Sequence, residues 1–402
     1  MTATLKATSL FSFHFSFFVF LLFLLASCRV SDGWDEPDGE KPPASGIVVP
    51  GSGLEEKLGW LYANARSGGG YIVEINQDES VYQTFLYFLN RINVTVTIQG
   101  IGTKRNITLL SRGNLFYVAG GVTLILANNI TLKGYDDNIY PLVYIAPGGV
   151  FIMNTGSGIT GNISGVTGGV YLDGGTFTMN GGAIFANSGG NICGSGVNVT
   201  AGTFTMNDGT ISGNYAGSGG TVTLIGGNFI MNGGNISGNT ARCGGAVMLN
   251  RGTFTMNGGT ISGNTAAING GAVTVGVEGA FTMRGGRISD NAAKAYGGAV
   301  YVGLTGDFHM NGGTIFGNTA AYYGWGVYVN GTFTKAGGTI SGYTGGAGSA
   351  NNIDMEKSGD LGLAVYAYSN SGVRKRRETT AGPEANLFYS GRNGAYSGEW
   401  DL

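Results

Sequence analysis

GTFTMNGGTISGNTA, residues 252–266, followed by GGAV at residues 270–273, is the clearest copy of a unit that recurs along the chain. Its phenylalanine returns at intervals of 26, 27, 25, 25, 27, 27 and 25 residues. These positions are Phe151, Phe177, Phe204, Phe229, Phe254, Phe281, Phe308 and Phe333. An isoleucine keeps step with them, at Ile159, Ile184, Ile211, Ile236, Ile261, Ile288, Ile315 and Ile340. Self-similarity at a period of about 20–50 residues indicates a solenoid or a related repeat architecture.

Each copy contains three short extended segments separated by Gly or Asn corners. In the first two, apolar residues alternate with other types, as in Val247-Met248-Leu249 and Phe254-Thr255-Met256, and the third contributes mainly its isoleucine. Alternation with one constant apolar face is typical of a half-buried strand. One such turn cannot offset its own loss of conformational entropy, so successive turns must stack. The sequence therefore predicts an all-β fold, a right-handed parallel β-helix of the pectin-lyase type with one turn per 25–27 residues.

The β-helix is expected over residues 71–367, with regular repeats at 148–346. Eleven to thirteen turns at about 4.8 Å each would give a length of about 55–60 Å. Residues 54–70 are predicted to form a short N-terminal capping helix whose apolar face holds Leu54, Leu58, Leu61, Tyr62 and Ala65.

Residues 368–402 are expected to form a C-terminal cap or an arm. The basic run Arg374-Lys375-Arg376-Arg377 is either a solvated face or a patch for anionic surfaces. The net charge of the whole chain is −2, which gives no electrostatic reason to expect nucleic acid as a partner.

Asparagine recurs at two corners of the repeat. The first column, expected to be a structural ladder, is Asn162, Asn187, Asn214, Asn239, Asn264, Asn291 and Asn318. The second is Asn154, Asn180, Asn207, Asn232, Asn257 and Asn311, interrupted by Arg284. Asparagine tolerates left-handed backbone at turns, and stacked amides can hydrogen-bond along an axis. Both columns are therefore interpreted as turn residues that join one turn to the next.

The N-terminus has the features of an export signal. Lys6 precedes an apolar run from Leu10 to Ala26, and this run ends in Leu25-Ala26-Ser27-Cys28. That string resembles the lipobox of bacterial lipoproteins, which implies cleavage between Ser27 and Cys28 and acylation of Cys28. An ordinary signal peptide with an incidental Cys is the alternative.

Residues 1–27 are accordingly predicted to be a signal peptide. Residues 28–53, with Pro37, Pro42, Pro43 and Pro50, would be the lipidated cysteine and a flexible tether. We expect an exported protein anchored by lipid to the bacterial outer membrane or cell surface, since two or more acyl chains make a stable anchor.

GGAV at Gly244, Gly270 and Gly297, with Phe-x-x-Asn at Phe177, Phe204, Phe229, Phe254 and Phe308, resembles the repeats of chlamydial polymorphic outer-membrane proteins. That resemblance implies a β-helical passenger domain linked to adhesion. The full unit, with the lipobox and KRRETTAGP at residues 375–383, is similar to Gly/Asn-rich repeat lipoproteins of spirochaetes. The chlamydial proteins end in a transmembrane domain for which the residues after the last repeat leave no room, so the lipid is the expected anchor.

Carbohydrate-active enzymes also use this fold, and they need carboxylates that converge in a cleft. Between Gly148 and Gly346 the acids are Asp173, Asp208, Glu278, Asp290 and Asp307, and they fall in different columns. The richest charged set is Arg284, Arg287, Asp290 and Asp307, interpreted as surface charge. His14 lies in the signal, and His309 is expected to face solvent. No catalytic residue, metal ligand or cofactor site is predicted.

The cysteines give a sharper geometric prediction. Cys193 and Cys243 each stand eleven residues before a repeat phenylalanine, and Ser218 has that position in the turn between them. Strands two turns apart are separated by about 9.6 Å, which is beyond disulfide reach. Both thiols are therefore predicted to be free.

Outward aromatic residues concentrate near the C-terminal end of the repeats, at Tyr301, Tyr322, Tyr323, Trp325 and Tyr328. Such a face can bind a glycan or a protein partner, or can form a ladder that only stabilises the fold. The predicted function is a monomeric, non-catalytic surface scaffold or adhesin whose partner is a host or environmental glycan or protein. A polysaccharide lyase or hydrolase and a purely structural envelope protein are the alternatives.

Overall fold

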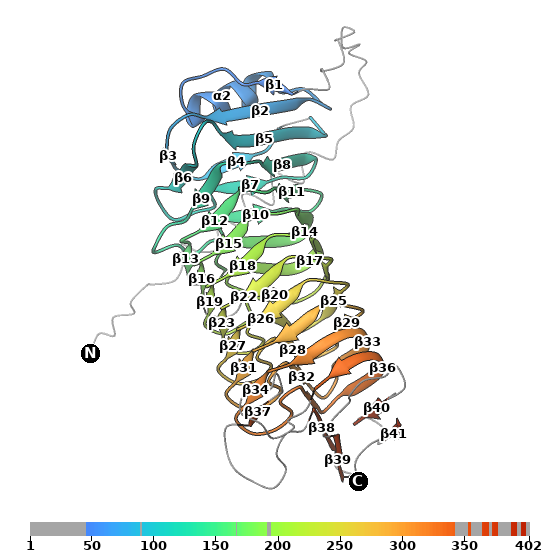
Figure 1. Ribbon diagram of the computed structural model, residues 1–402. Coiled ribbons are helices and arrows are strands. Elements are labelled where there is room, and N and C mark those ends of the chain that lie inside the picture. The colour runs from blue at the N-terminus through green and yellow to red at the C-terminus, as the bar shows by residue number, and fades with distance from the viewer. Residues whose placement is uncertain are drawn as a thin grey trace, which may run out of the picture. The chain divides into compact units, whose positions relative to one another are not determined.

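The computed structural model describes residues 46–88, 91–165, 167–190, 194–341, 353–354, 364–369, 372–376, 387–391 and 395–398. The chain divides into two units, Met1–Lys41 and Pro42–Leu402, and every described residue belongs to the second. Parallel strands of this unit stack into a β-solenoid of about 11 turns (Figure 1). The all-β prediction is confirmed, and the arrangement agrees with a right-handed parallel β-helix.

Each regular turn passes through three faces and a corner, which we name A, B, C and the corner sheet. Face A consists of β4 (Thr84–Leu86), β7 (Phe116–Val118), β10 (Val143–Ile145), the first parts of β14 (Val170–Met179) and β17 (Val197–Met206), β20 (Val222–Leu224), β24 (Val247–Leu249), β28 (Val273–Val275), β32 (Val300–Val302), β35 (Val327–Val329) and β38 (Val365–Ser369). Face B consists of β1 (Ile47–Val48), β2 (Gly70–Ile75), β5 (Val94–Gly100), β8 (Val122–Leu126), β11 (Val150–Met153), the second parts of β14 and β17, β21 (Asn228–Met231), β25 (Gly252–Met256), β29 (Gly279–Met283), and the first parts of β33 (Asp307–Phe316) and β36 (Thr332–Ile340). Face C consists of β3 (Glu79–Val81), β6 (Arg105–Leu109), β9 (Ile130–Lys133), β12 (Gly158–Thr160), β15 (Ala183–Phe185), β18 (Thr210–Ser212), β22 (Asn235–Ser237), β26 (Thr260–Ser262), β30 (Arg287–Ser289) and the second parts of β33 and β36.

The corner sheet is a fourth stack that was not predicted from the sequence. Its strands are β13 (Ile163–Ser164), β16 (Ser188–Gly189), β19 (Tyr215–Ala216), β23 (Thr240–Ala241), β27 (Thr265–Ala266), β31 (Ala292–Ala293), β34 (Thr319–Ala320) and β37 (Ile353–Asp354). All of them pair in parallel, for example Thr240 with Thr265 and Ala241 with Ala266. The turn therefore has four extended segments, the fourth only two residues long.

The inward columns stay in register from turn to turn. Phe254 pairs with Phe229 and Phe281, and its ring centroid lies 4.7 and 4.8 Å from theirs. Ile261 pairs with Ile236 and Ile288 on face C, and all of these side chains are fully buried. The predicted phenylalanine and isoleucine columns are thus confirmed as one continuous core.

The GGAV motif folds back over the outside of face A. Gly244 has a φ of +60°, and a Cβ there would lie 2.1 Å from the Val247 carbonyl oxygen, so no other residue fits. Farther along face A, the Thr274 hydroxyl donates to the Asn269 carbonyl of the preceding loop at 2.8 Å. Strands such as β20 and β28 are consequently buried on both faces, instead of being half-buried as the alternation suggested.

The N-terminal end is covered by α2 (Leu54–Asn64), which is shorter than the predicted 54–70 helix. Ser52 donates to the Glu56 carboxylate through its backbone N–H and its hydroxyl, at 2.8 and 2.9 Å, and so fixes the first turn of the helix. Tyr62, expected on the buried face, is exposed, and Lys57 is buried in addition to the predicted leucines. Lys57 Nζ donates to the Glu74 carbonyl of β2, which satisfies a backbone acceptor at the start of the stack.

The last residues of the tether predicted for residues 28–53 are part of the folded unit. β1 pairs with β2, Ile47 with Tyr71 and Val48 with Ile72, and Val49 is buried. Residues 46–53 therefore belong to the folded unit, because they extend face B by one strand and lead directly into α2.

The C-terminal end reverses strand direction. β39 (Gly372–Arg376) pairs antiparallel with β38. β40 (Leu387–Ser390) pairs antiparallel with β36, and β41 (Ala395–Gly398) with β40. Leu387 and Tyr389 are buried in the core, so the described part of β40 is a cap and not a free arm. An antiparallel edge also ends the parallel register that could otherwise continue.

Candidate functional site

The first asparagine column forms a buried ladder along the corner between face C and the corner sheet. Asn264 Nδ2 donates to the Ile236 carbonyl of the preceding turn at 2.9 Å, and to Asn291 Oδ1 of the next turn, also at 2.9 Å. The members from Asn162 to Asn318 have at most 1% of their surface exposed. Each central amide therefore ties three consecutive turns together. Asn138, which was not predicted as a member, extends the ladder by donating to Asn162 Oδ1 at 2.9 Å.

The left-handed backbone at this corner lies one residue before each asparagine, and not on the asparagines as expected. The residues with positive φ are Gly161, Ala186, Gly213, Gly238, Gly263, Asp290 and Gly317. Ala186 and Asp290 thus hold a conformation that glycine adopts at no steric cost. The ladder asparagines are selected for hydrogen bonding instead.

The second asparagine column is an exposed ladder. Asn207 Nδ2 donates to Asn180 Oδ1 at 2.9 Å, and Asn232 Nδ2 to Asn207 Oδ1 at 2.8 Å. Its amides therefore donate toward the N-terminal turn, whereas those of the buried ladder donate toward the C-terminal turn.

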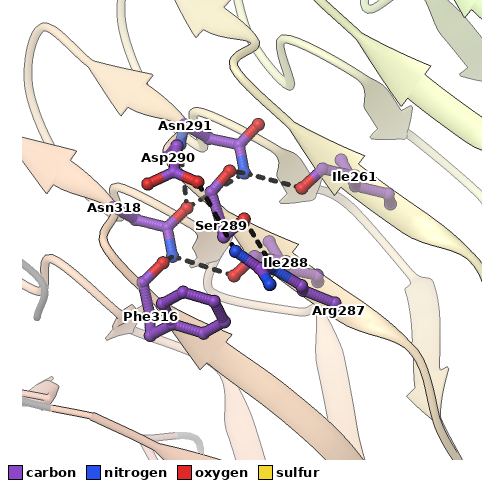
Figure 2. Close-up of polar contacts among 8 residues, drawn as sticks. All are labelled: Ile261, Arg287, Ile288, Ser289, Asp290, Asn291, Phe316 and Asn318. Carbon is purple, nitrogen blue, oxygen red and sulfur yellow. Dashed lines mark hydrogen bonds and ion pairs between the residues drawn. The ribbon is translucent and has the colours of Figure 1, made fainter. Parts of the chain in front are cut away.

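In the charged set at residues 284–307, the Arg287 guanidinium already has interaction partners within the protein. The guanidinium lies 4.2 Å above the ring centroid of Phe316 and 4.0 Å from the Asp290 carboxylate. Its Nε donates to Ser289 Oγ at 3.1 Å, beside the amides of Asn291 and Asn318 (Figure 2). Arg287 thus contacts residues of its own turn and Phe316 of the next turn of face C. About half of its side chain stays exposed, which agrees with its interpretation as surface charge.

The other acids are held locally and apart. Asp173 accepts the Tyr144 hydroxyl at 2.7 Å, Asp208 Oδ1 accepts the Gly209 N–H at 2.7 Å, and Glu278 lies 3.4 Å from Arg251. Across the described residues no three His, Cys, Asp or Glu side chains are grouped closely enough to hold a metal ion. Asp173, Asp208 and Glu278, on different turns, therefore each interact with a separate partner.

The predicted aromatic face is a compact group of tyrosines at the C-terminal end of face A. On the strands, Tyr301 and Tyr328 stack at 5.4 Å, and Tyr328 and Tyr366 at 5.5 Å. From the loops, Tyr296 packs 4.9 Å from Tyr328, and Tyr323 stacks 4.6 Å from Tyr366. We call these residues, with Tyr322 beside Tyr296, the tyrosine cluster. Tyr322 and Tyr323 are 53% and 42% exposed and form its solvent side.

Trp325 was predicted to face outward and does not. It is only 2% exposed and packs against Ala293 and Ala320 of the corner sheet. Trp325 stands in the column of Gly298, the second glycine of GGAV, and so precedes the strand of face A instead of lying on it.

Burial raises the pKa values of two tyrosines in the cluster. Desolvation, followed by the neighbouring Tyr301 and Tyr366 hydroxyls, holds the pKa of Tyr328 well above its usual range. Burial, and then the Cys243 thiol, raises the pKa of Tyr301. Both hydroxyls therefore stay protonated and neutral at physiological pH.

A second aromatic column on face A was missed. Phe85, Tyr117, Tyr144 and Tyr171 follow one another at 5.6, 5.0 and 5.3 Å. They occupy the same outward column as Tyr301, with Asn198, Thr223, Met248 and Thr274 between the two groups. The alternation in Phe116-Tyr117-Val118 indicates that Tyr117 faces outward. The irregular repeat length of the upstream turns, however, prevents the alignment of Tyr117 with the aromatic residues of neighbouring turns.

Several predicted features lie outside the described residues. These are Leu25, Ala26, Ser27 and Cys28 of the lipobox, the tether before Gly46, His14, Cys193 and Arg377. Cys243 has a free thiol. Within the described part of the chain, no helix has the length and apolar character needed to cross a membrane.

Comparisons with protein families, with curated proteins and with solved structures found no match to this chain.

Proposed function

We propose that this chain is an exported lipoprotein, anchored through Cys28, that serves as a non-catalytic surface scaffold or adhesin. The observation that carries the proposal is the tyrosine cluster, which leaves Tyr322 and Tyr323 exposed at the C-terminal end of face A. A contiguous cluster of solvent-exposed apolar side chains marks a binding surface, whereas a single exposed side chain does not. Tyrosine supplies a large apolar ring and a hydroxyl at a low entropy cost, which suits the recognition of a glycan or a protein.

The contrast between constant inward residues and variable outward residues supports a role in presenting side chains to a partner. Inward positions hardly change, whereas the partly exposed members of the outward column of face A range from Tyr171 through Met248 to Tyr301. A rigid stack of this kind can present different outward residues without a change in the core. The apolar run ending in Leu25-Ala26-Ser27-Cys28 supports export and lipid attachment.

Anchoring is tested by metabolic labelling with a palmitate analogue in cells that express the chain. The wild type should take up label, resist extraction by salt and be cleaved when intact cells are treated with protease. Cys28→Ser should lose the label and the membrane association. Label retained by Cys28→Ser, or a wild type protected from protease, would contradict surface anchoring through this residue.

Binding is tested on arrays of glycans and matrix proteins with the detergent-solubilised chain. The wild type should retain a defined ligand, and the Tyr322→Ala/Tyr323→Ala double variant should lose most of that affinity. Tyr215→Ala, at an equally exposed tyrosine on β19, is the matched control. Turnover of pectins or other uronides in the presence of Ca²⁺ would instead support the enzyme alternative.

A further inference from the structure

A hollow of about 410 Å³ opens at the opposite end of the fold, between α2 and the segment that leads from β3 through β4. Leu58 of α2 and Val81 of β3 line it and are themselves buried. Sites for small ligands have volumes of about 300–1,000 Å³, apolar linings and a few polar groups. The hollow has the size and the apolar base of such a site.

Three aromatic side chains surround this hollow and remain open to solvent. Tyr82, Phe85 and Tyr87 are 63%, 52% and 57% exposed. In the tyrosine columns of face A, each ring covers the face of the next. Among the described residues, Tyr82 and Tyr87 stack on no other ring, and Phe85 is the end member of its column. Ring faces are therefore available here for a ligand.

The wall between helix and strand is fixed before any ligand arrives. The Tyr62 hydroxyl donates to the Phe85 carbonyl at 2.5 Å, and the Tyr62 ring packs 5.9 Å from Phe88. Arg91 donates to the Tyr62 carbonyl at 2.9 Å. Tyr62 remains partly exposed, and the partial desolvation of its side chain raises its pKa, so this donor stays protonated at physiological pH. A preformed wall lowers the entropy cost of binding.

The polar lining narrows the ligand chemistry. Glu55 and Gln83 contribute a carboxylate and an amide, and the lining holds no Lys, Arg or His. Among the lining residues, a phosphate, sulfate or uronate would meet one negative charge and no cation, which disfavours it. Exposed ring faces carry partial negative charge and attract polarised C–H groups, while carboxylate and amide oxygens accept hydrogen bonds from hydroxyls. A neutral sugar offers both polarised C–H groups, which can pack on a ring face, and hydroxyls, which can donate hydrogen bonds.

We propose that this hollow is a binding site for a neutral oligosaccharide, stacked on Tyr82, Phe85 and Tyr87 and hydrogen-bonded through its hydroxyls to Glu55 and Gln83. The site is independent of the tyrosine cluster, because the two groups lie at opposite ends of face A, on β4 and on β32 to β38. The proposal therefore stands or falls separately from the function proposed above.

The test is a glycan array with the detergent-solubilised full chain, followed by calorimetry with each glycan that it retains. At least one neutral oligosaccharide should bind, and Tyr82→Ala and Tyr87→Ala should each weaken its Kd roughly tenfold. Glu55→Gln should weaken it several-fold, since the carboxylate accepts the stronger hydrogen bond. Tyr215→Ala and Tyr322→Ala should leave the Kd unchanged, and thermal unfolding of each variant checks that it folds.

Three outcomes would overturn the proposal. They are an array with no neutral glycan retained, retention of acidic glycans or proteins alone, and a Tyr82→Ala/Tyr87→Ala double variant that binds the neutral glycan like the wild type. Loss of binding only in Tyr322→Ala would assign the glycan to the tyrosine cluster and would equally reject the hollow.

Discussion

The side-chain oxygen of Asn264 accepts two hydrogen bonds from Asn239 in the preceding turn, from its backbone N–H at 3.1 Å and from its side-chain amide at 2.9 Å. The same relation repeats along the buried ladder. The corner between face C and the corner sheet is thus held by side chains that complete the hydrogen bonding of a buried turn.

Replacing Asn264 by alanine should therefore destabilise the fold strongly. The change leaves the backbone N–H and the amide N–H of Asn239 buried without this acceptor, and each such group costs about 1–3 kcal/mol. We expect Asn264→Ala to lower the free energy of unfolding by about 2–5 kcal/mol in urea denaturation. Asn232→Ala, in the exposed ladder, should cost about 0.5 kcal/mol or less. Equal losses in the two variants would argue against a structural role for burial of the ladder.

The phenylalanine stack predicts a similar contrast on face B. Phe254 is fully buried between Phe229 and Phe281, so Phe254→Ala should cost about 3–5 kcal/mol through lost burial and the cavity left behind. Thr255→Ala, at the adjacent outward position, should change stability by about 0.5 kcal/mol. Comparable urea midpoints for the two variants would mean that the inward and outward residues are assigned wrongly.

The left-handed column predicts opposite effects of two reciprocal substitutions. Ala186 has a φ of +51° and Gly213, in the next turn, a φ of +61° with no atom near the position of an added Cβ. Ala186→Gly should therefore stabilise the fold by about 0.5–1 kcal/mol, and Gly213→Ala should destabilise it by about 1 kcal/mol. Thermal unfolding measures both, and a stabilising Gly213→Ala would exclude the left-handed turn.

The inward columns could be predicted from the sequence because each of them serves one core. Phe254 and Ile261 recur with a constant spacing, and stacking demands the same residue type in the same position. The corner sheet escaped the prediction because Thr240-Ala241 is only two residues long and shows no alternation. Its signal was the recurrence of Thr-Ala after the ladder asparagine.

The burial of outward positions was harder to predict because it depends on segments outside the strands that fold over face A, and alternation within a strand does not reveal such a cover. The segment that carries GGAV buries Thr274, and Trp325, in the equivalent segment two turns later, is buried against Ala293 and Ala320. The candidate site was predicted through Tyr301, Tyr322, Tyr323 and Tyr328, but Tyr296 and the hollow beside α2 were missed. Those features depend on contacts between segments whose spacing is irregular.

The tyrosine pKa values predict an alkaline instability. The pKa of Tyr144, raised by burial and by the hydrogen bond to Asp173, and that of Tyr328 lie above the ordinary value of 10.0. Well below pH 10 both tyrosines are protonated in the folded and unfolded states, so they make no contribution to the pH dependence of stability. Above it the unfolded chain ionises first, and stability should fall as the pH rises.

Tyrosinate absorbance against pH, recorded with the unfolding midpoint, checks this expectation. A subset of tyrosines should ionise only as the fold is lost, and Tyr328→Phe should weaken the dependence of the midpoint on pH. Complete ionisation of all tyrosines in a chain that stays folded would be the opposite result.

The central claim is that equivalent residues of successive turns stack along one axis, and distances between spin labels test it most directly. In a chain with its native cysteines replaced by serine, labels at Thr178→Cys and Thr282→Cys are four paired strands apart on face B, and labels at Thr178→Cys and Thr334→Cys are six apart. At about 4.8 Å per strand, pulsed electron paramagnetic resonance should give separations of about 19 and 29 Å. Separations that do not increase with the number of intervening turns would contradict the β-helix and the arrangement of both proposed binding sites.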